Sequence, residues 1–111
     1  MTPDPKAEQV AKLNDELRKY GRGGIVVVTP GVQHNPRRTE IINAIRRYDF
    51  STAAEGNDPY GERDFMSVEV AGERYFGKID YYDLKMEGHS EDKSDPTKTK
   101  RVLTIMRSDE Y

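Results

Sequence analysis

Three carboxylates, Asp58, Glu62 and Asp64, lie close together in a segment rich in turn-forming residues, 57–65. Clustered carboxylate oxygens could hold Mg²⁺ or Ca²⁺, because both cations prefer oxygen ligands. The spacing does not match the EF-hand loop, and Asp58 and Asp64 equally suit the end of a turn and the start of a strand. We therefore predict no metal site here and interpret the segment as an acidic surface loop.

The two histidines, His34 and His89, lie in separate polar segments. A zinc site needs several ligands at short spacing, and a nucleophilic triad needs a nucleophile beside an oriented base. Neither pattern occurs around these residues. We interpret both histidines as solvated loop residues and predict no cofactor.

Acid–base catalysis would need two converging carboxylates. Asp80 and Asp83 flank a tyrosine pair, but residues at this spacing on one strand rarely converge. An enzyme that uses Asp58, Tyr60 and Glu62 is therefore the least favoured of three hypotheses, and we assign no catalytic residue.

Four arginines, Arg37, Arg38, Arg46 and Arg47, lie in one expected helix. Arginine side chains on a helix can contact nucleic-acid phosphates, although exposed arginines are more often solvated or paired. A nucleic-acid-binding module that uses this helix is the alternative hypothesis for function.

Aromatic residues follow the acidic loop, and their placement depends on strand register. A bulge at Gly77 would bring Phe76 to the face of Ile79, whereas an unbroken strand leaves Phe76 and Tyr82 beside Phe65. An exposed aromatic patch would indicate a partner surface, and a covered one a second face of the core. The candidate partner-binding residues are Asp58, Tyr60, Glu62, Asp64, Phe65, Phe76 and Tyr82.

The elements before the acidic loop can be predicted from hydrophobic periodicity and from the proline, glycine and asparagine residues that begin or end helices and strands. Residues 5–20 are expected to form a helix with Val10, Leu13 and Leu17 on its buried stripe. Residues 25–28 are expected to form a β-branched strand covered on both faces. Asn35-Pro36 indicates the start of a second helix that continues to about residue 48.

Three strands are expected after the loop, over 64–70, 73–82 and 101–107, and Gly72 is expected to adopt positive φ in the first turn. Residues 84–100 form a long polar connection. The order α-β-α-β-β-β predicts an α+β fold, with two helices on an antiparallel sheet of about four strands.

Composition limits the possible classes of protein. The 111 residues predict one domain over 1–111, with 1–4 disordered, and the hydrophobic fraction of 34% predicts a thin core. Without cysteine or a long apolar run, we expect a cytoplasmic protein that does not enter the membrane. Residues 1–50 hold nine basic and six acidic side chains, whereas residues 51–111 hold nine basic and fourteen acidic ones. The net charge of the whole chain is −2, so the protein has no overall basic field that would favour nucleic-acid binding.

Three segments carry a family resemblance: 57–65 (NDPYGERDF), 78–83 (KIDYYD) and 101–106 (RVLTIM). Together with Leu13-Asn14-Asp15 and the strand that begins at Gly23, they resemble a small bacterial domain-of-unknown-function family. That family is found mainly in alphaproteobacterial genomes, plasmids and integrated elements. It has no assigned activity, so the resemblance implies no catalytic residue. The setting among mobile-element genes implies plasmid maintenance or counter-defence.

These observations favour a non-enzymatic binding module that engages a protein partner, such as a host defence complex. The acidic loop over residues 55–64 and the acidic C-terminal half motivate this hypothesis, because an acidic surface can occupy a basic nucleic-acid channel. The oligomeric state cannot be derived from the pattern.

Overall fold

The computed structural model describes residues 5–52, 58 and 60–111. Residues 1–4, expected to be disordered, and the start of the acidic loop lie outside the described residues. The elements are α1 (Pro5–Tyr20), β1 (Ile25–Val28), α2 (Pro30–Gln33), α3 (Arg38–Arg46), η1 (Phe50–Thr52), β2 (Phe65–Val70), β3 (Glu73–Tyr82), β4 (Lys100–Arg107) and η2 (Ser108–Glu110).

Helix α1 has the predicted limits. Proline at the first helical position suits the start, since its missing N–H would have no partner there. Val10 and Leu17 are buried on one stripe, and Asn14 lies on the same stripe. Gly21, with φ of +69°, ends the helix, and its N–H donates to the Leu17 carbonyl at 2.9 Å.

The four strands form one mixed sheet in the order β1-β4-β3-β2. β2, β3 and β4 are antiparallel neighbours, but β1 runs parallel to β4. The prediction of a fully antiparallel sheet was therefore wrong. No tight hairpin links β1 to β4, because several elements lie between them, so turn chemistry did not set their relative direction.

The predicted burial of β1 on both faces was also wrong. β1 is an edge strand, and Ile25, Val26 and Val27 are 48%, 42% and 40% exposed. An apolar β-branched run is typical of a central strand. Here the run lies at the edge because β4 takes the central position beside β3.

The described residues form three α-helices rather than the two expected. Pro30 stops β1 as expected but also begins the short helix α2. Asn35 precedes α3 without being its N-cap: its Oδ1 accepts the Arg37 N–H at 2.8 Å in a turn, and α3 begins at Arg38. α3 buries Ile41 and Ile45, as the spacing predicted.

β2 and β3 form a hairpin through Ala71 and Gly72, both at positive φ (+53° and +81°). β3 pairs continuously with both neighbours and has no bulge at Gly77. Of the two registers considered, the unbroken one is therefore present.

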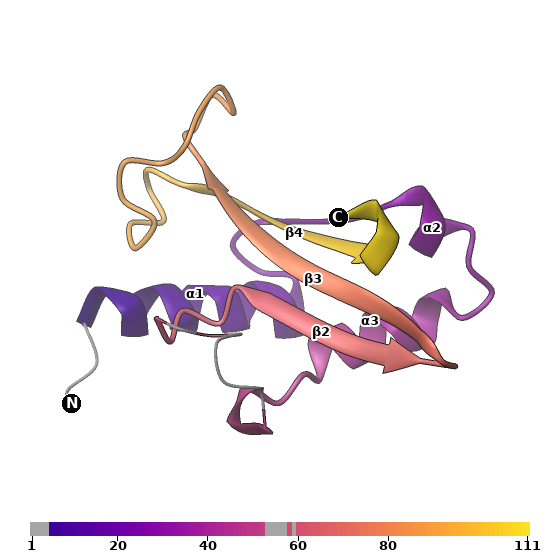
Figure 1. Ribbon diagram of the computed structural model, residues 1–111. Coiled ribbons are helices and arrows are strands. Elements are labelled where there is room, and N and C mark those ends of the chain that lie inside the picture. Colours follow the sequence, from indigo (N-terminus) through magenta and orange to yellow (C-terminus); the bar gives the residue numbers. More distant parts are fainter. Residues whose placement is uncertain (1–4, 53–57, 59) are drawn as a thin grey trace.

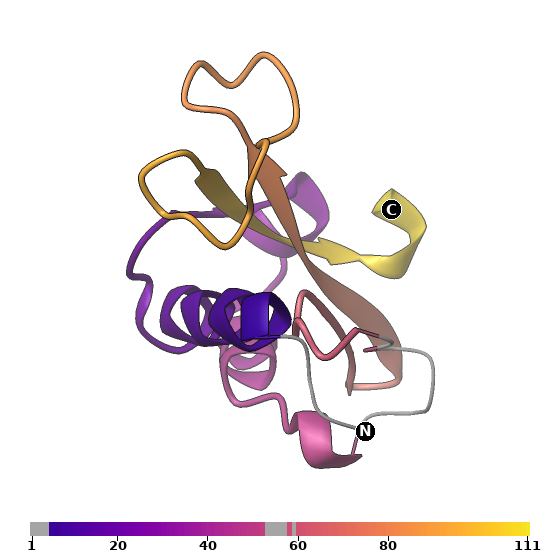
Figure 2. The same ribbon diagram turned by 90° about the vertical axis from the view of Figure 1, so that its left-hand side faces the viewer.

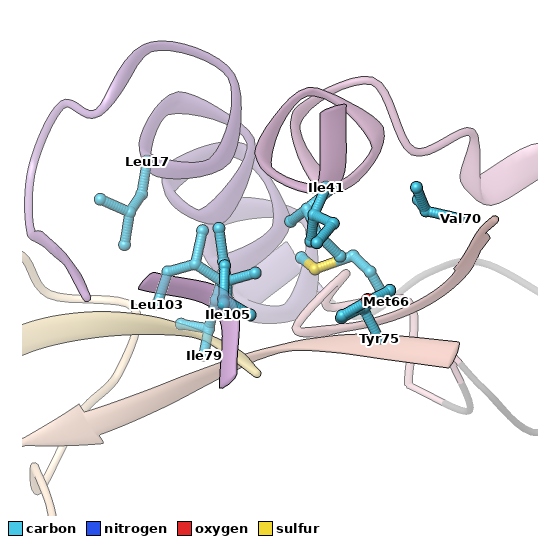
Figure 3. Close-up of a cluster of buried hydrophobic side chains, with 10 residues drawn as sticks. Leu17, Ile41, Met66, Val70, Tyr75, Ile79, Leu103 and Ile105 are labelled. Atoms are coloured by element: carbon cyan, nitrogen blue, oxygen red, sulfur yellow. The ribbon is translucent and has the colours of Figure 1, made fainter. Parts of the chain in front are cut away.

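The helices α1 and α3 lie on one face of the sheet, as Figures 1 and 2 show from two directions. The hydrophobic core fills the space between these two helices and the sheet (Figure 3). Its buried members are Leu17, Val32, Ile41, Ile45, Met66, Val70, Tyr75, Ile79, Leu103 and Ile105. Gly77 allows α3 to approach closely, because a Cβ there would lie 3.0 Å from Cγ2 of Ile45.

Residues 84–99 contain no helix or named strand and fold into successive turns (Figure 1). Asp83, Asp92 and Asp95 each accept backbone N–H groups two residues ahead, which is the geometry of Asx turns. No helix among the described residues is long and apolar enough to cross a membrane.

Candidate functional site

A buried polar cluster joins α1, β3 and β4. Asn14 is fully buried, and its Nδ2 donates to the Tyr81 hydroxyl at 2.8 Å and to the Glu62 carbonyl at 2.9 Å. Its Oδ1 accepts from Nε of Arg101 at 2.7 Å. One amide thus links three segments that are distant in sequence, and we call these residues the Asn14 network.

Arg101 is a buried cation, 2% exposed. Besides Asn14, its guanidinium donates to the carbonyl of Lys93, and its Cζ lies 5.2 Å from the centroid of the Tyr81 ring. Burial lowers the pKa of Arg101 from its ordinary value. Amide, carbonyl and ring thus hold this cation in place of a carboxylate.

Asp64 completes the network, because the Tyr81 hydroxyl donates to its Oδ2 at 3.0 Å. Burial raises the pKa of the Asp64 carboxyl, although the hydrogen bond from Tyr81 opposes this shift. Burial and the nearby Asp64 charge also raise the pKa of Tyr81. Tyr81 therefore stays neutral and acts as a hydrogen-bond donor.

Two ion pairs fasten the acidic loop to its surroundings. Lys93 of the long connection contacts the Glu62 carboxylate at 2.7 Å, and Glu62 is 8% exposed. Asp15 of α1 contacts Arg63 at 2.6 Å. Arg63 has positive φ (+57°), and its N–H donates to Oδ1 of Asp58 at 2.9 Å. These contacts hold a backbone conformation that a non-glycine residue rarely adopts.

The Asn14 network holds together segments that are distant in the sequence. Asn14, Tyr81 and Arg101 are occupied by one another, and no serine, threonine or cysteine hydroxyl or thiol contacts Asp64 within the described part of the chain. Among residues 5–52, 58 and 60–111, no group of three potential ligands could hold a metal ion.

The aromatic candidates lie on the opposite face of the sheet, the one turned away from α1 and α3. Phe65 and Phe76 have ring centroids 5.1 Å apart, and the Tyr111 ring packs edge-on against both. Tyr82 lies on the same face near the far end of β3. Tyr60, in the loop, is 77% exposed.

We call this face the open face. By strand alternation and register it carries Ile25, Val27, Phe65, Ser67, Glu69, Arg74, Phe76, Lys78, Asp80, Tyr82, Lys100, Val102, Thr104 and Met106. One row crosses all four strands through Val27, Thr104, Lys78 and Phe65. Lys78 lies 3.4 Å from Asp80 in an ion pair near the centre.

The seven partner-binding candidates therefore divide into two groups. Glu62 and Asp64 point into intramolecular contacts, and Asp58 holds the turn at Arg63. Phe65, Phe76 and Tyr82 share the open face, and Tyr60 lies exposed in the loop.

The four arginines of the alternative hypothesis also differ among themselves. Arg46 donates from Nε and a terminal nitrogen to the Lys19 carbonyl at 3.1 and 2.8 Å. These bonds give this carbonyl, in the last turn of α1, a hydrogen-bond partner. Arg37 pairs with Glu40 at 3.3 Å, and Arg38 donates to the Gln33 carbonyl. Arg47 lines two adjoining surface hollows.

Sequence reasoning missed Asn14 and Arg101 as members of a site. Periodicity carried the signal for both. Arg101 alternates with Leu103 and Ile105 along β4, which assigns it to the covered face, and Asn14 lies on the buried stripe of α1. A charged residue in the phase of a buried set needs a polar partner, and Asn14 supplies it.

The three segments quoted for the family resemblance meet at the Asn14 network, which takes Glu62 and Asp64 from the first, Tyr81 from the second and Arg101 from the third. No curated protein and no solved structure matches the chain. The profile of the family described as "Protein of unknown function (DUF3768)" matches residues 28–110, well over half of the sequence. The chain therefore belongs to the DUF3768 family of proteins of unknown function.

Proposed function

We propose that the protein is a non-enzymatic binding module that engages a protein partner through the open face. One observation carries this proposal: α1 and α3 cover one face of the sheet, while the other carries apolar and aromatic side chains and is covered at one end by Tyr111, which follows the short helix η2 (Figure 2). A sheet face of this kind is the usual place for a second surface to pack.

The chemistry of the open face suits a protein partner. Phe65, Phe76 and Tyr82 supply aromatic area, and the Lys78–Asp80 ion pair supplies polar groups between them. Protein interfaces are enriched in aromatic residues and depleted in unpaired charge at their centre. Tyr60 extends the proposed surface toward the loop.

The acidic loop contributes to this proposal mainly as a support. Glu62 and Asp64 hold the loop against Lys93 and Tyr81, so their charges are used within the protein. We therefore expect their substitution to weaken partner binding indirectly, by releasing the loop that carries Tyr60.

The wider role that we propose is that of a mobile-element accessory protein that inhibits a host defence complex. Its support is the resemblance described above and the acidic excess of residues 51–111. Expression in a host with an active defence system should raise the efficiency of plasmid or phage entry. Unchanged entry across the defence systems of the natural host would contradict this role but not the binding surface.

A nucleic-acid-binding module remains the alternative. Arg47 and Asn43 favour it, since both line the adjoining hollows on α3, whereas Arg46 and Arg37 already have partners. Phosphate contacts would give an affinity that falls steeply with salt, and Arg46→Ala with Arg47→Ala would reduce that affinity. Absence of any salt-sensitive gel shift would remove this alternative.

The direct test of the main proposal is affinity capture of a stoichiometric partner with Tyr82→Ala, using Tyr20→Ala as the matched control. Both tyrosines lie near the surface, but Tyr20 lies at the end of α1, away from the open face. We expect the Tyr82 variant alone to lose the partner. Equal capture by both variants, or no partner with the wild type at low salt, would contradict the proposal.

A further inference from the structure

We propose that two copies of this chain associate through β1, which pairs antiparallel with β1 of the second copy and joins two four-stranded sheets into one. β1 bonds to β4 on one side only, and no other strand in the described part of the chain lies beyond it. The outward N–H and C=O groups of β1 thus form a template for another strand.

The exposure of β1 points to a missing partner on this edge. Ile25, Val26 and Val27 are consecutive, so their side chains alternate between the two faces of the sheet, and all three are at least 40% exposed. Neither face of the strand is therefore fully covered. A neighbouring strand would bury the flanks of these side chains at the same time as it satisfied the backbone.

β1 is short, with four residues, but it lacks the charged side chains and the proline that also protect a sheet edge. No charged residue occurs from Gly23 to Thr29, no proline interrupts the strand, and its register with β4 is continuous. The opposite edge of the same sheet differs. β2 carries Glu69, which is ion-paired to Arg74 at 3.7 Å, and α3 packs against its inner face.

The sequence of β1 favours a second copy as the occupant. A twofold axis normal to the sheet, through the Val26 pair or the Val27 pair, makes every opposed pair between two β1 residues apolar. β1 itself carries no charge, and the charged residue that precedes it in the sequence, Arg22, is already paired with Glu16 at 3.2 Å. An uncharged strand offers a foreign partner no charge pattern to recognise, whereas an identical strand matches it at each position.

This arrangement goes beyond the proposed function and does not depend on it. An axis normal to the sheet keeps the helices of both copies on one side and the open faces on the other. Ile25 and Val27 of each copy would then connect the two open faces into one surface.

The test is sedimentation velocity of the purified full chain over a wide concentration range, with Val27→Lys as the variant. Val27 is exposed on the open face, so lysine is tolerated in the monomer, but in the dimer it places charge against an apolar strand. We expect the wild type to dimerise and Val27→Lys to raise the dissociation constant at least about tenfold. Glu69→Lys, on the opposite edge, is the matched control and should dimerise as the wild type does.

Amide hydrogen exchange of the wild type keeps the test decisive if the variant fails to fold. Protection of the β1 amides that increases with protein concentration would support the pairing. A monomer at every concentration, a dimer that Val27→Lys leaves intact, or a monomer whose β1 pairs only with a different protein would each overturn it.

Discussion

The Nε of Arg101 lies 2.7 Å from the Oδ1 of Asn14, which ties β4 to α1 in the interior of the protein. Asn14 also donates to Tyr81 on β3, so its amide uses both ends to orient a cation and a phenol. These contacts hold the ends of β3 and β4 and the turns between them against α1. The helix layer is thereby fixed to one face, which leaves the other face open.

Asn14→Ala is expected to lower the free energy of unfolding by about 2–4 kcal/mol, because it removes one hydrogen-bond partner from the buried Arg101 guanidinium and one from the Tyr81 hydroxyl. Urea denaturation measures the change. Asn43→Ala is the matched control on α3, where the side chain is only partly buried and alanine favours the helix. Equal stability of the two variants would show that the Asn14 network contributes little.

Asp64→Asn is expected to change how stability depends on pH. The pKa of Asp64 is raised by burial, so the folded state binds a proton more tightly than the unfolded chain. Its contribution to stability is complete below the ordinary value of 3.8 and is lost as pH rises through the folded pKa. Relative to Asp64→Asn, the wild type should therefore lose stability as pH rises from 3.8. Parallel unfolding curves over this range would contradict the assignment.

Glu110→Gln is expected to act in the opposite direction. Hydrogen bonds from Thr29, Arg107 and Gly31 hold the pKa of the Glu110 carboxyl below its ordinary value of 4.5. The stabilisation is present above that value and is lost as pH falls through the lower folded pKa. The variant should melt earlier than the wild type at neutral pH and converge with it in acid. Glu87→Gln, an exposed glutamate, should show no such difference.

Gly77→Ala is expected to destabilise the fold by about 1–3 kcal/mol, since the added methyl would overpack the contact between α3 and β3. Its Cβ would lie 2.8 Å from Sδ of Met66 and 3.0 Å from Cγ2 of Ile45. Gly88→Ala is the control, because the nearest atom there lies at an ordinary 3.7 Å. Chemical denaturation compares the two, and a neutral Gly77 variant would mean that α3 can move away freely.

Local patterns predicted the parts of the fold that are governed by local physics. Pro5 and Gly21 indicated the limits of α1, and the turn at Gly72 indicated the β2–β3 hairpin. The position of β1 could not be predicted in this way. Its four residues read as a central strand, and only the long-range pairing of β4 with β3 moves them to the edge.

The candidate site was less accessible to sequence reasoning than the fold. The register without a bulge placed Phe65 and Phe76 on one face of the sheet, and the structure has this register. Strand alternation alone decides which face the two rings share. Glu62 and Asp64 were predicted to be at the surface because they are acidic. Both carboxylates instead make contacts within the protein, Glu62 with Lys93 and Asp64 with Tyr81. These partners are distant in the sequence, so no local pattern could predict the contacts.

Methyl NMR of the labelled protein with its captured partner shows directly whether the open face binds that partner. If the partner binds the open face, the methyl signals of Val27, Val102 and Thr104 on that face should shift or broaden when the partner is added. The signal of Ile42, on α3, should change little. Perturbations confined to α3, with the open-face methyl signals unchanged, would contradict the account.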